Sequence, residues 1–148
     1  MSSLLRLLAA STLAVAFAAP AHAEDKNTVT VGISVGTAEK IFDVVQKVAA
    51  RDGLTIKLVK FNDYQLPNAA LNAGDLDANA FQHKPFLDNQ IKARGFDIVP
   101  VGLTVTAPLG FYSHKIKSLN DLPEGASVGI QNDPSNGNRA LRLLAAYK

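Results

Sequence analysis

The sequence predicts an α/β fold built on a parallel sheet, and three observations lead to this prediction. After residue 28, short apolar runs with period two alternate with longer runs whose apolar residues recur every three or four positions. The helical runs are long enough for right-handed crossovers between parallel strands. The 148 residues are 47% hydrophobic and include no Cys, so we expect a packed core without disulfides.

The first predicted unit is a strand, a turn and a helix. Residues 29–33 alternate between apolar and small or polar side chains, and 34–36 form a turn of small residues. Apolar residues then recur at helical spacing over 37–51. Thr37 is the expected N-cap of this helix, and Asp52-Gly53 is its stop signal.

Further units of the same kind follow. Strands are predicted over 54–61, 76–81 and 97–103, and helices over 67–73 and 85–94. Both helices have a proline near the start and a glycine just after the end, which is the usual asymmetry of helix termini.

Three polar and aromatic turns should share one edge of the sheet. Residues 34–37, 62–64 and 81–85 each follow a predicted strand. The carboxyl ends of parallel strands meet at one edge, and ligands of open α/β sheets bind there. We therefore expect the functional site at this edge.

The chain changes character over 105–113, which is extended and interrupted by Gly and Pro. The elements predicted beyond it are a short turn capped by Ser118 at 119–122, a strand at 126–130 and a helix at 136–147. These elements cannot bury a core of their own. We therefore expect a first α/β lobe over 24–107, followed by a crossover and an incomplete second lobe over 108–148.

The first 23 residues have the composition of a cleavable secretory signal. Arg6 precedes an apolar run over 7–19, and Ala21-His22-Ala23 is a small-x-small cleavage site before Glu24. The apolar run is shorter than the roughly 20 residues that span a bilayer, which argues against a membrane anchor. Without a Cys to carry a lipid, we expect a soluble periplasmic protein with no lipid anchor.

Composition and motifs exclude several function classes. The formal net charge is +2 with scattered charges, which argues against nucleic-acid binding, and we expect a monomer. The histidines His22, His83 and His114 lack further ligands at metal-binding spacing, so no metal is expected. Neither a nucleophile motif nor a phosphate-binding loop is present, so we expect no cofactor and no catalysis.

An aromatic cluster is a candidate for ligand recognition. Phe81, His83 and Phe86 lie beside a predicted strand end, where they could form a wall for an apolar or thioether side chain. In the alternative interpretation, the two phenylalanines belong to the core and His83 caps a turn.

A second candidate lies at the start of the last helix. Asn136 and Arg139 are expected in its first turn, where unpaired backbone N–H groups already favour an anion. An arginine there can bind a carboxylate through two parallel hydrogen bonds. The alternative is an arginine exposed on a solvated helix face, which describes Arg142 better.

Five motifs stand in a particular order: FNDY at 61–64 with PN at 67–68, GDLDAN at 74–79, FQH at 81–83, KIKSLNDLP at 115–123 and NDPSNGNRAL at 132–141. Together they resemble the NlpA/MetQ-type substrate-binding proteins of bacterial ABC importers, over most of 29–148. The resemblance implies a periplasmic binding protein-like fold of type II, in which two α/β lobes close over one small molecule.

The same resemblance implies a function and a site. It implies capture of a small amino acid, methionine or similar, and its delivery to the membrane subunits of an ABC importer. The site residues that follow from it are Tyr64, Phe81 and His83 as pocket walls, Phe86 where the family commonly has Tyr, Arg139 as the carboxylate clamp and Asn136 beside it.

Two other interpretations stay open at this point. One is an extracytoplasmic enzyme on the same scaffold, since a fold does not determine a function. The absence of a nucleophile motif and of an acid/base pair argues against it. The other is a truncated fragment without a working site.

Overall fold

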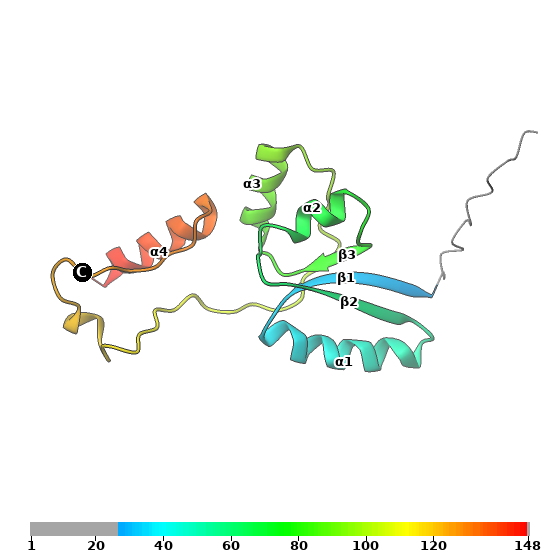
Figure 1. The fold of residues 1–148 in the computed structure, drawn as a ribbon, viewed down its shortest axis with the longest axis horizontal. Helices are drawn as coiled ribbons and strands as arrows, with labels where there is room; N and C mark the ends of the chain where they lie inside the picture. The colour runs from blue at the N-terminus through cyan, green and yellow to red at the C-terminus, as the bar shows by residue number, and fades with distance from the viewer. Residues whose placement is uncertain (1–26, 148) are drawn as a thin grey trace, which may run out of the picture.

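The computed structural model describes residues 27–147, which form a three-stranded parallel sheet with helices on both faces (Figure 1). The sheet order is β2-β1-β3, with β1 at Thr28–Ser34, β2 at Thr55–Phe61 and β3 at Ala78–Ala80. Helix α1 covers one face, and α2 and α3 lie on the other (Figure 1). The predicted α/β class is confirmed.

The strand register brings the predicted turns to one edge. Ser34 at the end of β1 pairs with Phe61 at the end of β2, and Ile33 pairs with Ala80 at the end of β3. The loops that follow these strands therefore leave the sheet side by side, as the parallel arrangement requires.

Helix α1 spans Thr37–Arg51, which matches the predicted helix. Its predicted N-cap is wrong, because Gly36 is the cap and Thr37 is the first helical residue. Gly36 has a φ of 101°, a backbone conformation that residues with a Cβ rarely adopt. The Glu39 carboxylate accepts a hydrogen bond from the Gly36 N–H at 3.0 Å, which is the part of a capping box that the third helical residue supplies.

The other helices also lie close to their predicted positions. Their bounds are Pro67–Asn72 for α2, Lys84–Arg94 for α3, Leu119–Asp121 for the short 3₁₀ helix η1 and Pro134–Ala146 for α4. Ser118 caps η1 as predicted, because its side chain accepts a hydrogen bond from the Asn120 N–H at 3.2 Å. Figure 1 shows that the chain from α3 to η1 is extended and carries α4 to the side of α3.

Two predicted strands, at 97–103 and 126–130, are wrong: the structure assigns no strand to either segment. The first has Val99, Val101 and Leu103 in the expected alternation, but their exposed fractions are 71%, 93% and 103%. A strand needs a neighbouring strand for its backbone hydrogen bonds, and neither segment pairs with one in the described part of the chain. An alternating pattern of apolar residues is therefore not enough to form a strand when no neighbouring strand is present to pair with it.

Buried apolar side chains lie on both faces of the sheet. Leu76, Phe86 and Leu87 are buried on the side of α2 and α3, whereas Val31 and Ile33 alternate with Gly32 along β1 and so face α1. Gly32 in β1 leaves the room that Leu76 occupies, because a Cβ there would lie 2.6 Å from the leucine Cδ1. The close packing of the Leu76 side chain against β1 thus explains why the central strand has a glycine at this position.

The opposite face is less well covered. Helix α1 has no fully buried residue, and Val44, Val45 and Val48 on it are 37–59% exposed. None of the helices in residues 27–147 combines the length and apolarity needed to cross a membrane. The predicted secretory signal at 1–23 lies outside the described residues.

Candidate functional site

Three aromatic rings lie together at the carboxyl edge of the sheet. The Phe86 ring lies 5.5 Å from the Tyr64 ring at 60°, and 6.0 Å from the Phe81 ring at 79°, measured between centroids. Phe86 is only 2% exposed, whereas Tyr64 and Phe81 are half-buried. Phe86 is therefore a core residue, as one of the two interpretations expected, and it supports the two rings that reach the surface.

His83 is the N-cap residue of α3, but it does not cap the helix with its side chain. Its carbonyl accepts hydrogen bonds from the N–H groups of Phe86 and Leu87 at 3.1 and 3.2 Å. The ring Nε2 is buried and has no hydrogen-bond partner among the described residues. The imidazole thus keeps one nitrogen available for a partner that the chain itself does not supply.

Burial lowers the pKa of His83, and the positive charge of Arg139 lowers it further, while Asp133 acts in the opposite direction. The imidazole is therefore uncharged at neutral pH. Helix α3, which begins after His83, contacts helix α4, which carries Arg139, although the two lie in distant parts of the sequence.

A network of amide side chains holds the backbone between Phe81 and His83. Gln82 and Asn68 exchange two hydrogen bonds, of 2.8 and 2.7 Å, between their amides. Asn79 donates to the same Asn68 oxygen at 3.0 Å. Asn68 is 1% exposed, so this network fixes Gln82 to the core.

Replacing Asn68 with Ala is expected to lower the free energy of unfolding by about 1–3 kcal/mol, because the Gln82 and Asn79 amides lose buried partners. Urea unfolding followed by circular dichroism measures this change. Asn89→Ala is the matched control, since Asn89 is exposed on α3. Equal stabilities of the two variants would contradict the role of the network.

Asp133 is the N-cap of α4 and is 6% exposed. Its Oδ1 accepts hydrogen bonds from the N–H groups of Ser135 and Asn136 at 3.0 and 2.9 Å, and from the Ser135 hydroxyl at 2.6 Å. Its Oδ2 accepts from Asn136 Nδ2 at 3.0 Å and from the Tyr64 hydroxyl at 2.9 Å. One carboxylate thus connects the start of α4 to the aromatic cluster.

These contacts hold Asp133 in its charged form. Burial by itself would raise the pKa of Asp133, but the hydrogen bonds from Ser135, Asn136 and Tyr64 outweigh it and lower the pKa to about 2. Since the ordinary value is 3.8, the carboxylate stabilises the fold fully above that pH, and this contribution is lost as the pH falls towards 2.

We expect the wild-type chain to lose about 2 kcal/mol more stability than Asp133→Asn when the pH falls from about 7 to about 2. Asparagine keeps the size and the capping ability of Asp133 but does not titrate. Urea unfolding at several pH values measures the difference. Parallel pH profiles for the two proteins would contradict this prediction.

Arg139 is exposed, and its Nη1 donates a hydrogen bond to Asn136 Oδ1 at 3.1 Å. It lies in the second turn of α4 rather than the first, because the helix begins at Pro134 and not at 136 as predicted. Helical side chains lean towards the N-terminus, so the guanidinium still reaches the first turn. Asn136 and Arg139 thus act as neighbours through a direct hydrogen bond.

The six predicted site residues therefore gather in one region, where the carboxyl edge of the sheet meets the start of α4. Asn68, Gln82 and Asp133, which hold these residues in place, are not among the predicted site residues. An Asp-Pro-Ser sequence is a typical helix start, so Asp133 could have been found as a cap. Its contact with Tyr64 depends on the tertiary fold and has no local signal.

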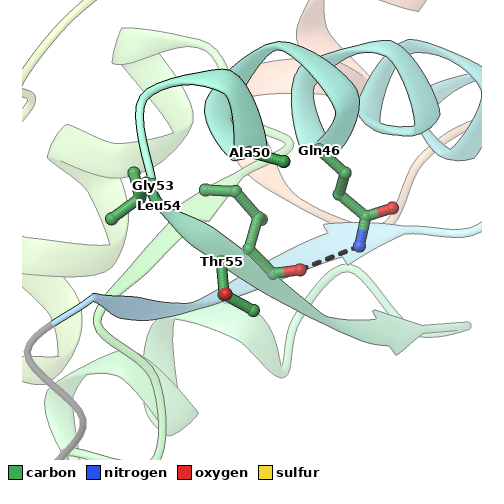
Figure 2. Close-up of a pocket in the computed structure, with 6 residues that line it drawn as sticks. Gln46, Ala50, Gly53, Leu54 and Thr55 are labelled. Carbon is green, nitrogen blue, oxygen red and sulfur yellow. Dashed lines mark hydrogen bonds between the residues drawn. The ribbon is translucent and has the colours of Figure 1, made fainter.

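A hollow of about 340 Å³ lies at the other end of the sheet (Figure 2). It is lined by Gln46, Ala50, Gly53, Leu54, Thr55 and Ile56, and Figure 2 shows the Gln46 amide bonded to the Ile56 carbonyl. None of these side chains is charged, and the hollow lies between α1 and the amino end of β2. It therefore lacks the features of the site at the carboxyl edge.

Residues 27–147 contain no group of three or more His, Asp or Glu side chains that could hold an ion.

Comparison with known proteins points to one family. The family model described as NlpA lipoprotein matches residues 29–148. A D-methionine-binding lipoprotein MetQ of Salmonella typhi is 53% identical over 122 residues, which are 82% of this chain and 45% of that protein. The chain thus spans about half the length of the curated relatives it matches.

Solved structures give the same picture. A nutrient-binding protein from Burkholderia cenocepacia bound to methionine is 55% identical, with a TM-score of 0.77 over 80% of this chain and 50% of that one. A periplasmic substrate-binding protein of an ABC transporter from Coxiella burnetii is 44% identical, with a TM-score of 0.76 over 80% of this chain and 51% of that one.

One prediction about localisation is wrong. We expected a soluble periplasmic protein without a lipid anchor, but the matching family is described as lipoproteins and the Salmonella relative is named a lipoprotein. The expectation of no lipid anchor depended on the absence of Cys, and the expectation of a soluble protein depended also on the short apolar run at 7–19. The descriptions of the family and of the 53% identical relative as lipoproteins overturn both.

Proposed function

Since the chain belongs to the NlpA lipoprotein family, we propose that it captures methionine or a similar small amino acid outside the cytoplasm for an ABC importer. The protein would act as a monomer, deliver the ligand to the membrane subunits of the importer and need no nucleic-acid partner. Relatives that carry methionine in their names support the choice of ligand.

One observation in the structure carries this proposal. The start of α4, which carries Asn136 and Arg139, is hydrogen-bonded through Asp133 to the half-buried Tyr64. The His83 imidazole, between Phe81 and Phe86 in the sequence, has a buried Nε2 without a hydrogen-bond partner among the described residues. A free amino acid offers matching groups, since it has a carboxylate for Arg139 and a side chain for Tyr64 and Phe81. A thioether packs favourably against aromatic rings, which favours methionine among apolar amino acids.

The arrangement binds a ligand and carries out no chemistry on it. The Arg139 fork can hold a carboxylate through two hydrogen bonds. The uncharged His83 imidazole can donate or accept one hydrogen bond through Nε2. We propose that residues 24–107 form the first lobe of a two-lobe protein, and that 108–148 form the crossover and the start of the second lobe.

Calorimetric titration with L- and D-methionine tests the proposed function. Methioninamide, which lacks the carboxylate, should bind much more weakly than methionine, and norleucine, which lacks the sulfur, should bind slightly more weakly. Equal affinity for methionine and methioninamide would contradict the carboxylate clamp. Absence of binding of any amino acid would contradict the proposed function.

The His83→Ala variant is expected to weaken methionine binding by about tenfold, since it removes one hydrogen-bonding group and one wall of the site. His114→Ala is the matched control, because His114 is an exposed histidine outside the site. Titration of both variants measures the effect. An unchanged affinity of His83→Ala would remove His83 from the site.

A further inference from the structure

We propose that Tyr64 and Asp133 are positioning residues. The hydrogen bond between the Tyr64 hydroxyl and the Asp133 carboxylate fixes the start of α4 against the sheet layer, and so sets where Asn136 and Arg139 stand relative to Phe81 and His83. The effect on ligand affinity rests on the proposed function, but the effect on the position of α4 does not.

The bond joins parts of the chain that are 69 residues apart. The Tyr64 hydroxyl lies 2.9 Å from Asp133 Oδ2 and 2.8 Å from Asn132 Oδ1. A phenol has one proton to donate, and a carboxylate is a stronger acceptor than an amide oxygen. Asp133 is therefore the main acceptor, and Asn132 is a second, weaker one.

The tyrosine side of the bond is rigid. The Tyr64 ring packs against Phe86, which is itself 2% exposed and packs against Phe81. Tyrosine has only two side-chain torsions, and packing restricts both of them. The hydroxyl therefore occupies a fixed point above the carboxyl edge of the sheet, which is what a positioning group requires.

On the other side of the bond, the Asp133 carboxylate fixes the positions of Asn136 and Arg139. The same Asp133 carboxylate holds Asn136 through its backbone N–H and its side-chain amide. Asn136 in turn accepts the hydrogen bond from Arg139. The contacts thus run without a gap from the aromatic cluster through Asp133 and Asn136 to the guanidinium.

This assignment changes the role of Tyr64. Its ring can still contact a ligand, but its hydroxyl proton is already given to Asp133. The backbone at α4 makes the arrangement tight, because a Cβ on Gly137 would lie 2.8 Å from the Gln131 carbonyl oxygen. The segment that carries Asn132 and Asp133 therefore packs closely on the first turn of the helix.

Distance measurements between spin labels test the position of α4 without any ligand. The sequence contains no Cys, so labels on Lys92→Cys in α3 and Arg142→Cys in α4, both exposed positions, report the spacing of the two helices. We expect one narrow distance distribution for the doubly labelled chain. Adding Tyr64→Phe should broaden or shift this distance distribution, because the variant keeps the ring but loses the hydrogen bond to Asp133.

Two further variants make the test specific. Adding Asp133→Ser should change the distribution in the same way, since serine still caps the helix but cannot reach the Tyr64 hydroxyl. Adding Tyr112→Phe should leave it unchanged, since Tyr112 is 93% exposed. A distribution that Tyr64→Phe leaves unchanged would overturn the proposal, even if Asp133→Ser failed to fold.

Methionine titration of unlabelled Tyr64→Phe gives the second readout. We expect about a tenfold loss of affinity together with the changed distances. A loss of affinity with unchanged distances would mean that the hydroxyl contacts the ligand directly, and would overturn the positioning role. If the wild-type chain bound no amino acid, the proposed function would fail, while the distances would still decide the role of Tyr64.

Discussion

The Arg139→Ala variant is expected to lose about 30- to 5000-fold in affinity for methionine. This range corresponds to roughly 2–5 kcal/mol, the cost of removing one partner of a desolvated, hydrogen-bonded charge pair. The ligand carboxylate would keep the dipole of α4 but lose both hydrogen bonds of the guanidinium. Calorimetric titration with methionine measures this loss.

Arg142→Ala is the control for this experiment. Arg142 is also exposed on α4, but it lies nearly one turn further from the start of the helix. Its removal changes the net charge by the same amount and should leave the affinity almost unchanged. A wild-type affinity for Arg139→Ala would show that the carboxylate is held elsewhere.

The Phe86→Ala variant is expected to lower the free energy of unfolding by about 3–5 kcal/mol, which is the usual cost of truncating a buried phenylalanine. Phe86 is 2% exposed and contacts the rings of Tyr64 and Phe81, so a cavity would open directly beneath both. Urea unfolding followed by circular dichroism measures the loss.

Tyr112→Ala truncates an aromatic ring that is 93% exposed, and it should change the stability by less than about 0.5 kcal/mol. If Phe86→Ala does not fold, Phe86→Leu keeps most of the buried volume and should show a smaller loss in the same direction. Wild-type stability for either variant at Phe86 would contradict its role as the support of the cluster.

Local patterns in the sequence predicted much of the fold. The bounds of α1 follow from apolar spacing and from the Asp52-Gly53 stop. The edge that carries the site follows from the order of strands and helices, because parallel strands must end on the same side. The bounds of α1 were predictable because they depend on contacts within one helix. The edge of the site was predictable because it depends only on the direction in which the strands run.

Features that depend on distant partners were not predictable. Residues 97–103 alternate like a strand but pair with no strand in the described chain. Asn68 has no local sign of its role, because its partner Asn79 lies in the next strand and its partner Gln82 follows that strand. Asp133 is recognisable as a helix cap, but its bond to Tyr64 exists only after α4 has docked.

The six candidate site residues could be named from the sequence, but their arrangement could not. Phe86 illustrates the difference, since its position beside His83 suggested a pocket wall whereas its burial makes it a support. Whether a side chain faces a ligand or the core depends on which helix face packs inward, and a short aromatic run does not determine that.

A crystal structure of the protein grown with methionine tests the central claim most directly. We predict that the ligand carboxylate lies about 2.7–2.9 Å from two nitrogens of the Arg139 guanidinium, and that the thioether lies against Phe81 and Tyr64. Methionine bound away from the start of α4, for example in the hollow beside Gln46, would contradict the account.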